Sequence, residues 1–322
     1  MTADVVPLAT GVYLAAHLTP FAEWLARDDV TEILINQPEE VWIETAGVNG
    51  MIRVNAPAIN DKLLERLALQ IARETHQGIN RERPVLAATL PDGARVQIIA
   101  PPATRKHWAL AIRRHRLLDV PLSAYDHGAL SAKSSSDWRK QDASADPIDF
   151  LKRAVAARAT ILISGGTSSG KTTFLNALLR EVPADQRIIL VEDTPEIRLV
   201  HPNALGLVAV KGEMGEAKLS TNDLLQSSLR MRPDRIVLGE LRGNEAVSFL
   251  RAINTGHPGS FSTIHANSPQ GALEQLALMV MQSGLGLSRS ETIDYAKSVV
   301  DVIVQLDRSG GIRSVSDVMI CA

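Results

Sequence analysis

A segment of eight residues in the middle of the chain has the residue types and the spacing that bind phosphate. Residues 165–172 read Gly-Gly-Thr-Ser-Ser-Gly-Lys-Thr, which satisfies the P-loop pattern G-x-x-x-x-G-K-[ST]. An apolar run, 161–163, precedes the segment, and apolar residues at helical spacing follow it. In this context the glycines allow backbone N–H groups to converge on phosphate oxygens at the positive end of a helix. The segment predicts a nucleotide-binding loop rather than a plain turn between a strand and a helix.

The loop also contains the side chains that a triphosphate and its metal ion need. We expect Lys171 to bridge the β- and γ-phosphates of ATP and Thr172 to hold Mg²⁺. The nucleotide-binding residues predicted from this segment are Gly165, Gly166, Thr167, Ser168, Ser169, Gly170, Lys171, Thr172 and Thr173.

Two acidic residues follow predicted strands and are candidates for polarising water beside the γ-phosphate. The apolar run 236–238 leads into Glu240, and the run 188–191 leads into Glu192. Acids at the carboxyl ends of parallel strands meet at one edge of a sheet, although either residue alone could be an ordinary turn residue. We predict Glu240 as the main catalytic acid, with Glu192 helping to organise water and Mg²⁺.

A histidine segment supplies a third group of polar residues. Residues 260–265 alternate as a strand does and end at His265, which could contact the γ-phosphate or position a catalytic acid. The nearby His257 could instead be an ordinary surface histidine. The two histidines lack a third ligand in the local sequence, so they do not predict a metal site.

Arginines form two groups, and guanidinium groups stabilise the charge that spreads over the γ-phosphate oxygens during phosphoryl transfer. One group brackets the strand at 236–238, and from it Arg230 and Arg232 are predicted to be catalytic. The other group crowds the end of the amino-terminal region, and from it Arg113 and Arg114 are predicted to bind nucleotide. The remaining members of the two groups are Arg95, Arg105, Arg235 and Arg242.

The elements that would position these residues divide the chain into two domains. Residues 1–116 predict a small α/β domain, with strands at 31–36 and 41–45, a helix capped by Asn60 and a hairpin around residues 91–93. Residues 117–145 are rich in Ser, Ala, Asp and Lys and predict a linker. Asp146 and Pro147 then form an N-cap and first-turn pair that opens the second domain, 146–322.

The second domain alternates strands and helices, which predicts a largely parallel sheet with helices on its faces. Strands are expected at 160–164, 187–191, 236–239 and 260–264, and helices from 171, over 224–230 and over 245–253.

The composition restricts the class of protein. The 322 residues are 45% hydrophobic and 22% charged, which excludes whole-chain disorder. The formal net charge of −2 argues against a protein that mainly binds nucleic acid. A single cysteine excludes an intrachain disulfide, and neither a signal peptide nor a membrane-spanning run is found. These features indicate a cytoplasmic protein, although the apolar positions near residues 12–18 could touch a membrane surface or pack locally.

The motifs together resemble those of the type II/type IV secretion ATPase superfamily. Residues 191–196 are similar to its Asp box, 229–240 to its Walker B region and 255–266 to its His box, and they follow the P-loop in the same order. Within the superfamily the chain most resembles the VirB-eleven-type traffic ATPases of type IV secretion and conjugation. The resemblance also includes the amino-terminal residues 31–36, 41–44, 90–93 and 112–114.

This resemblance implies a RecA-like P-loop domain with a smaller amino-terminal α/β domain that carries an antiparallel sheet. It implies a homohexameric ring at the cytoplasmic face of the inner membrane, with nucleotide held between the two domains. The ring would hydrolyse Mg-ATP to energise substrate translocation or pilus biogenesis, and its partners would be other type IV secretion components, with nucleic acid not expected as a main ligand. A DNA translocase and a nucleotide-gated scaffold with little turnover remain as alternatives, and the sequence does not identify the transported substrate.

Overall fold

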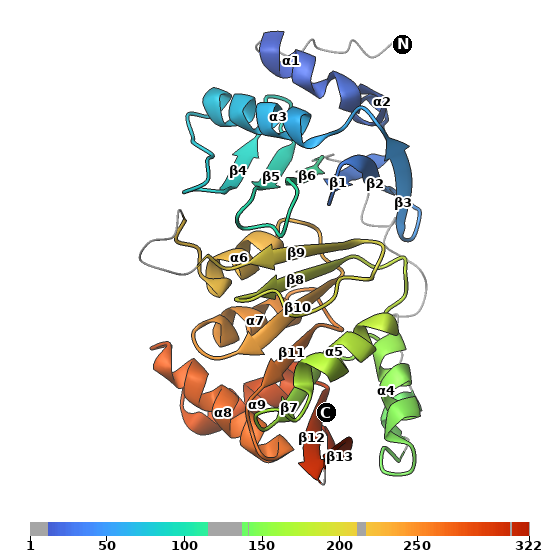
Figure 1. The fold of residues 1–322 in the computed structure, drawn as a ribbon, viewed down its shortest axis with the longest axis vertical. Coiled ribbons are helices and arrows are strands. Elements are labelled where there is room, and N and C mark those ends of the chain that lie inside the picture. The colour runs from blue at the N-terminus through green and yellow to red at the C-terminus, as the bar shows by residue number, and fades with distance from the viewer. Residues whose placement is uncertain (1–11, 115–136, 141, 211–216, 310, 322) are drawn as a thin grey trace, which may run out of the picture. The chain divides into compact units, whose positions relative to one another are not determined.

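The computed structural model describes residues 12–114, 137–140, 142–210, 217–309 and 311–321 (Figure 1). The chain forms two compact units. The first combines residues 1–115 with 185–195 and 203–233, and the second combines 116–184 with 196–202 and 234–322. Most of the predicted linker, including its run of serines, lies outside the described residues, so the predicted domain boundaries stay a prediction.

The amino-terminal part of the first unit is an antiparallel sheet with helices against it. The strand order is β3-β2-β1-β6-β5-β4, and every neighbouring pair in it is antiparallel. This sheet confirms the predicted strands and hairpin, whereas β3 and β6 were not predicted as strands. The elements are α1 (Val12–Leu18), a 3-10 turn (Thr19–Phe21), α2 (Ala22–Ala26), β1 (Val30–Ile35), β2 (Glu39–Thr45), β3 (Met51–Ala56), α3 (Asp61–Glu74), β4 (Val85–Thr89), β5 (Arg95–Ile99) and β6 (Ala109–Arg113).

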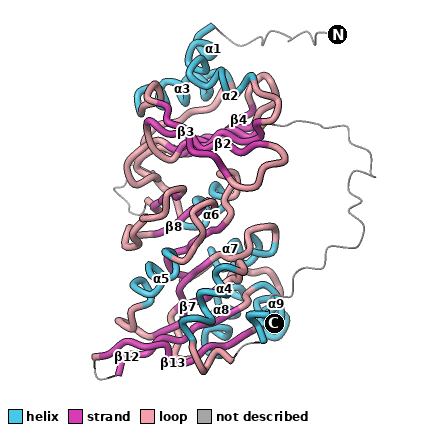
Figure 2. Tube along the Cα trace, turned by 90° about the vertical axis from the view of Figure 1, so that its right-hand side faces the viewer, coloured by secondary structure: helices cyan, strands magenta, loops and turns pink. Residues whose placement is uncertain are grey.

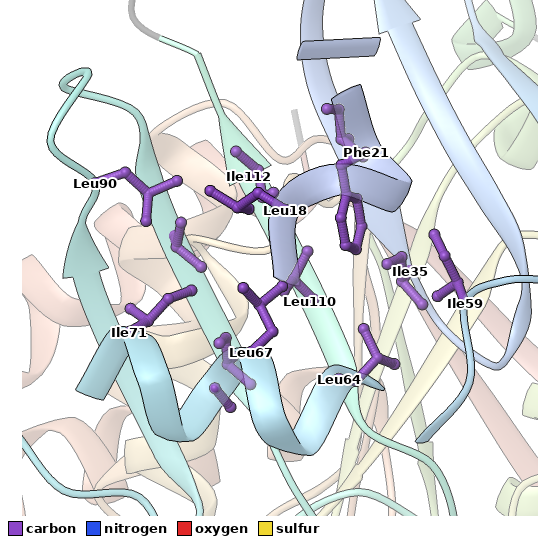
Figure 3. Close-up of a cluster of buried hydrophobic side chains, with 14 of the residues drawn as sticks. Leu18, Phe21, Ile35, Ile59, Leu64, Leu67, Ile71, Leu90, Leu110 and Ile112 are labelled. Carbon is purple, nitrogen blue, oxygen red and sulfur yellow. The ribbon is translucent and has the colours of Figure 1, made fainter. Parts of the chain in front are cut away.

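Helix α3 supplies the centre of this unit's apolar core. The Asn60 side chain accepts a hydrogen bond from Leu63 N at 3.0 Å and so caps the helix as predicted. Leu64, Leu67 and Ile71 then recur at helical spacing and are buried against the sheet (Figure 3). Leu14 and Leu18 belong to the same core, so the apolar residues of α1 pack locally.

The sheet also carries buried charge. Glu32 on β1 lies opposite Glu44 on β2 and is 2% exposed. The Arg113 Nε atom donates to Glu32 Oε1 at 2.6 Å, and Arg232, in the same unit, pairs with Glu44. Burial raises the pKa of the Glu32 carboxyl to about 7, although the charge and hydrogen bond of Arg113 act in the opposite direction. The two carboxyls in register are therefore each paired with a guanidinium from another element.

The later segments of the first unit are β8 (Ile188–Glu192), β9 (Ala204–Val208) and α6 (Thr221–Ser228). The two strands pair in parallel, and α6 begins with a capping box formed by Ser220 and Asp223. Buried Arg187 donates to Asn203 Oδ1 at 2.9 Å, and Asn36 donates to the same oxygen at 3.0 Å. These hydrogen bonds attach β8 and β9 to the end of β1.

The second unit contains a mainly parallel sheet, in which the neighbouring strands are β13-β12-β7-β11-β10. β12 and β13 form an antiparallel hairpin, which is visible side by side in Figures 1 and 2, and the other pairs are parallel. The predicted alternation of strands and helices is confirmed, whereas α8, α9 and the hairpin were not predicted. The elements are a 3-10 turn (Asp137–Lys140), α4 (Pro147–Ala156), β7 (Ile161–Gly165), α5 (Lys171–Arg180), β10 (Arg235–Leu241), α7 (Glu245–Asn254), β11 (Phe261–Ile264), α8 (Pro269–Gln282), α9 (Arg289–Val299), β12 (Val302–Ser309) and β13 (Ile312–Ile320).

Arg235 is a fully buried cation at the start of β10. Its guanidinium donates to Val155 O at 2.7 Å and to Gly259 O at 3.0 Å, and it lies 5.6 Å from the centre of the Phe261 ring. Burial lowers its pKa to about 10. Arg235 therefore connects α4, β10 and β11. No helix among the described residues is long and apolar enough to cross a membrane.

The raised pKa of Glu32 makes the stability of the protein depend on pH. The protonated carboxyl is favoured by folding, so its contribution is complete below the ordinary pKa of 4.5 and is lost as the pH rises through about 7. At pH 8 Glu32→Gln should therefore be more stable than the parent by on the order of 2 kcal/mol, and at pH 4.5 the two should be equal. Urea unfolding at both pH values measures this difference.

The matched control is Glu65→Gln, which makes the same change on the exposed face of α3. A Glu32→Gln protein that is less stable than the parent at pH 8 would show that the ion pair with Arg113 outweighs the cost of burial.

Candidate active site

The predicted phosphate loop connects β7 to α5 in the second unit. Gly170 precedes α5 with φ of 96°, and Ser168 has φ of 62°, so the backbone enters the left-handed region twice. A Cβ atom at Gly165 would lie 2.3 Å from Ser169 Oγ. These positions give the close turn before α5, and the start of a helix is a place where backbone N–H groups can bind an anion.

The Lys171 ammonium is buried at the base of this loop. It donates to Gly165 O at 2.9 Å and to Gly166 O at 3.0 Å. Lys171 as a whole is 8% exposed. Burial lowers the pKa of Lys171, while the nearby charge of Glu240 raises it. The loop thus holds a desolvated cation beside its own backbone.

His265 connects this lysine to an acid. The residue follows β11, and its Nδ1 atom lies 3.3 Å from Lys171 Nζ, while its Nε2 atom lies 2.7 Å from Glu240 Oε1. An ammonium has only protons to donate, so Nδ1 must be the acceptor and Nε2 carries the ring proton toward the acid. The three side chains form a chain from the phosphate loop to the end of β10.

Glu240 has one oxygen engaged and one with capacity left. Its Oε2 atom pairs with Arg242. Its Oε1 atom contacts His265 at the distance of an ion pair, but it is buried and has no aligned hydrogen bond within the described residues. A buried carboxylate oxygen of this kind can accept a hydrogen bond from a further group such as water.

Glu192 lies in the first unit, at the end of β8. Its side chain is 3% exposed and forms an ion pair with Arg105, from the segment between β5 and β6. The backbone of this segment also pairs with β9, where Thr104 and Leu207 form a bridge. The sequence placed Arg105 only within a group, and the pair joins residues 87 positions apart, so no local signal identifies it.

Two of the predicted arginines line one cleft of about 570 Å³ in the first unit. Arg113 and Arg230 lie around it together with Arg95 from β5. Gln97, also in its wall, is 3% exposed, and both polar atoms of its side chain are buried without a hydrogen bond within the described part of the chain. The cleft therefore combines three guanidinium groups with an amide that has unused hydrogen-bonding capacity.

The other two predicted arginines have structural partners in the first unit. Arg114 donates to the carbonyl oxygens of Trp24, Arg27 and Val30. Arg232 has φ of 56°, and its Nε atom donates to Glu44 Oε2 at 3.1 Å. Both guanidinium groups hold the amino-terminal sheet and the segments around it.

The remaining loop residues differ in exposure. Thr167, Ser168 and Thr173 are exposed, Thr172 is partly buried, and the buried Ser169 hydroxyl has no hydrogen bond within the described residues. The described residues hold no group of three or more His, Cys, Asp or Glu side chains that could bind a metal ion by themselves. The structure thus brings Lys171, His265 and Glu240 together in the second unit, and it places Glu192 and the four predicted arginines in the first.

Comparisons with known proteins agree with these motifs. Residues 15–309 match the family model described as type II/IV secretion system protein. The type IV secretion system protein VirB11 of Bartonella henselae is 35% identical over 333 residues, which cover 96% of this chain and 93% of that protein. PtlH, a type IV secretion system protein of Bordetella pertussis, is 38% identical over 314 residues, which cover 92% and 90% of the two chains.

A solved structure matches the fold over the same range. The VirB11 ATPase from the Brucella suis type IV secretion system, in complex with sulphate, is 35% identical, with a TM-score of 0.88 over 96% of this chain and 94% of that one. The match confirms the expected fold of a P-loop ATPase with a smaller amino-terminal α/β part. The chain belongs to the type II/IV secretion system protein family.

Proposed function

We propose that the chain hydrolyses Mg-ATP to energise substrate translocation or pilus biogenesis in a type IV secretion system. The observation that carries this proposal is the contact of Lys171 with His265 and of His265 with Glu240 at the phosphate loop. These side chains would supply a cation to the phosphate oxygens and a carboxylate to the attacking water. A loop that bound nucleotide only as a scaffold would have no need of the acid or the imidazole.

Each of these three residues has a role that follows from its contacts. Lys171 would exchange its bonds to the Gly165 and Gly166 carbonyls for phosphate oxygens, which are stronger acceptors for a desolvated ammonium. The Glu240 carboxylate would act as the base for the attacking water. His265, with its Nε2 proton toward Glu240, would keep that carboxylate oriented, and its Nδ1 atom would accept a hydrogen bond from Lys171.

The residues of the loop fit a magnesium ion bound with the nucleotide. Mg²⁺ commonly takes one or two protein oxygens and completes its octahedron with phosphate oxygens and water, so the absence of an acidic cluster among the described residues is compatible with it. The Thr172 hydroxyl is the proposed protein ligand, and Glu192 is the second candidate. The ion would neutralise the charge that develops on the phosphates.

The arginines of the first unit are proposed to meet the nucleotide as well. Arg113 and Arg230 line a cleft in which guanidinium groups outnumber the acids, and such a surface favours phosphate. Arg114 and Arg232 already donate to partners, which supports a role in holding the amino-terminal part in place. Glu192 is balanced by Arg105 and would act together with it.

The relatives support the assignment to type IV secretion, because VirB11 and PtlH are proteins of such systems. The sulphate of the Brucella suis ATPase agrees with an anion-binding site in this fold. We also propose that the chain acts as a homohexamer attached peripherally to the cytoplasmic face of the inner membrane, with other secretion components as partners.

Replacement of Lys171 by alanine tests the proposal directly. The variant should lose at least about 100-fold in Mg²⁺-dependent ATP hydrolysis, since it lacks the charge that faces the phosphates.

Purified protein is assayed for phosphate release over a range of protein concentrations, with and without DNA, and its mass in solution is measured in parallel. Turnover that rises with assembly to a six-membered ring and ignores DNA supports the secretion ATPase. Strong stimulation by DNA would favour a translocase, and full activity of Lys171→Ala would refute the mechanism.

Replacement of Glu240 by glutamine tests the assignment of the acid. Glutamine keeps the shape but cannot attract a proton from water, so kcat should fall by about 10² to 10⁴ while nucleotide binding is retained. The control Glu274→Gln alters an exposed ion pair on α8 and should keep full activity. Adding His265→Ala to Glu240→Gln should lower kcat little further, because the two side chains act as one unit. Losses that multiply would show that His265 works independently of Glu240.

A further inference from the structure

A row of polar side chains crosses the amino-terminal sheet from β2 to β4. Its members are paired in register on neighbouring strands, and in strand order they are Glu44, Glu32, Arg113, Arg95 and Thr89. Side chains in register on neighbouring antiparallel strands point to the same face of a sheet. The last three members line the cleft of about 570 Å³ in the first unit. The row therefore leads from a pair of acids to a cationic cleft.

The charges of this row are separated by sign. Glu44 and Glu32 stand side by side at one end, and Arg113 and Arg95 stand side by side at the other. Like charges in register destabilise a strand pair. Arg232 pairs with Glu44 and offsets the acidic end. Glu32 is the only acid in register with an arginine of the row, so it offsets the cationic end.

Glu32 and Arg113 differ strongly in their access to water. The Glu32 side chain is 3% exposed, whereas the Arg113 side chain is 61% exposed. The Arg113 Nε atom donates to Glu32 Oε1 at 2.6 Å. Arg113 thus meets a buried acid on one side and reaches the cleft with the exposed part of its side chain. An anion in the cleft and the Glu32 carboxylate would compete for the charge of one guanidinium.

The surroundings of Glu32 make its charge depend on Arg113. Burial raises the pKa of Glu32 to about 7, and the charge of Glu44 on β2 raises it further. Arg113 on β6 lowers this pKa through its charge and its hydrogen bond, and Arg232, from the segment after α6, lowers it less. An anion that takes up part of the Arg113 charge would weaken the largest influence that keeps Glu32 ionised. The carboxyl would then gain a proton.

We propose that Glu32 is a positioning residue that couples the binding of an anion in the cleft to the uptake of a proton. The anion engages Arg113, the hydrogen bond from Arg113 Nε to Glu32 weakens, and a proton from solvent forms an O–H bond on the Glu32 carboxylate. No bond of the anion changes. The proton removes the cost of a buried acid that has lost its partner. The inference rests on the proposed function, in which arginines of this cleft meet the nucleotide, and it adds a proton to that binding step.

The sign of the coupling follows from the pKa of Glu32. Anion binding moves this pKa upward from about 7, so protons are taken up above that pH. At about pH 5.5 the carboxyl is protonated with and without the anion, and no uptake is expected. By reciprocity, protonation of Glu32 strengthens anion binding.

Sodium sulfate is the probe, because sulfate itself does not titrate in this range of pH. It is added to lightly buffered Lys171→Ala protein, in which the phosphate loop lacks its cation, and sodium chloride of equal ionic strength is the blank. The pH electrode reads the proton uptake with and without the further change Glu32→Gln. The difference between the two proteins should be roughly half a proton or more per chain at about pH 8, and close to zero at about pH 5.5.

The affinity for sulfate gives a second readout, which a merely structural acid would not produce. Glutamine resembles the protonated carboxyl, so Glu32→Gln should bind sulfate roughly five- to tenfold more tightly than its Lys171→Ala background at about pH 8. The two should bind equally at about pH 5.5. Equilibrium dialysis with radiolabelled sulfate measures both, and urea unfolding checks that the variants are folded.

Glu65→Gln is the matched control, because it removes an acid from the exposed face of α3. In the same background it should leave proton uptake and sulfate affinity unchanged. Equal proton uptake with and without Glu32, or no gain in affinity in Glu32→Gln at about pH 8, would overturn the inference. Either result in a chain that hydrolyses ATP would leave the proposed function standing. Uptake that depends on Glu32, in a chain that with Lys171 intact forms no ADP, would support the inference and overturn the proposed function.

Discussion

The site depends on the hydrogen bonds that the buried Lys171 ammonium makes. Lys171 is largely removed from water and touches no carboxylate of the described residues, so its charge is held by two backbone carbonyls and one imidazole nitrogen. Each of these acceptors fixes a different element, since Gly165 ends β7, Gly166 begins the turn and His265 follows β11. Burying a cation costs free energy unless acceptors of this kind are supplied. The position of the lysine therefore determines the shape of the loop and the end of the neighbouring strand.

Glu240, which is linked to Lys171 through His265, lies where the pairing of β10 and β11 is irregular. β10 and β11 pair in regular parallel register at Val237 and Leu238, and the register shifts before Leu241. Glu240 lies within the shifted part, while Thr263 Oγ1 donates to Gly239 O at 2.8 Å and stabilises it. A bulge re-aims the side chains that follow it. At the other end of the strand the buried Arg235 connects β10 to the segment before β11, so the two strands meet in one fixed alignment.

The sequence predicted those features that depend on near neighbours. The turn between β7 and α5, the caps at Asn60 and Asp146 and the hairpin of β4 and β5 are set by residues a few positions apart, and all of them are present. The hairpin of β12 and β13 was missed, because the largely exposed β13 lacks the apolar alternation that marks a half-buried strand. The partners of charged residues were also missed. Arg105 meets Glu192 across 87 positions, and only the tertiary fold creates such a pair.

The arginines show why residue type alone is a weak guide to function. Arg113 neutralises the buried Glu32 and Arg232 neutralises Glu44, so either one would have to leave a desolvated acid unpaired in order to bind phosphate fully. Leaving such an acid unpaired is strongly unfavourable. Arg95 and Arg230 are exposed at the same cleft, and the described residues give neither an acidic partner. Arg95 also lies opposite Arg113 on the neighbouring strand, and an incoming anion would relieve that repulsion. Within the cleft, Arg95 and Arg230 would therefore accept an anion at less cost to the fold than Arg113 would.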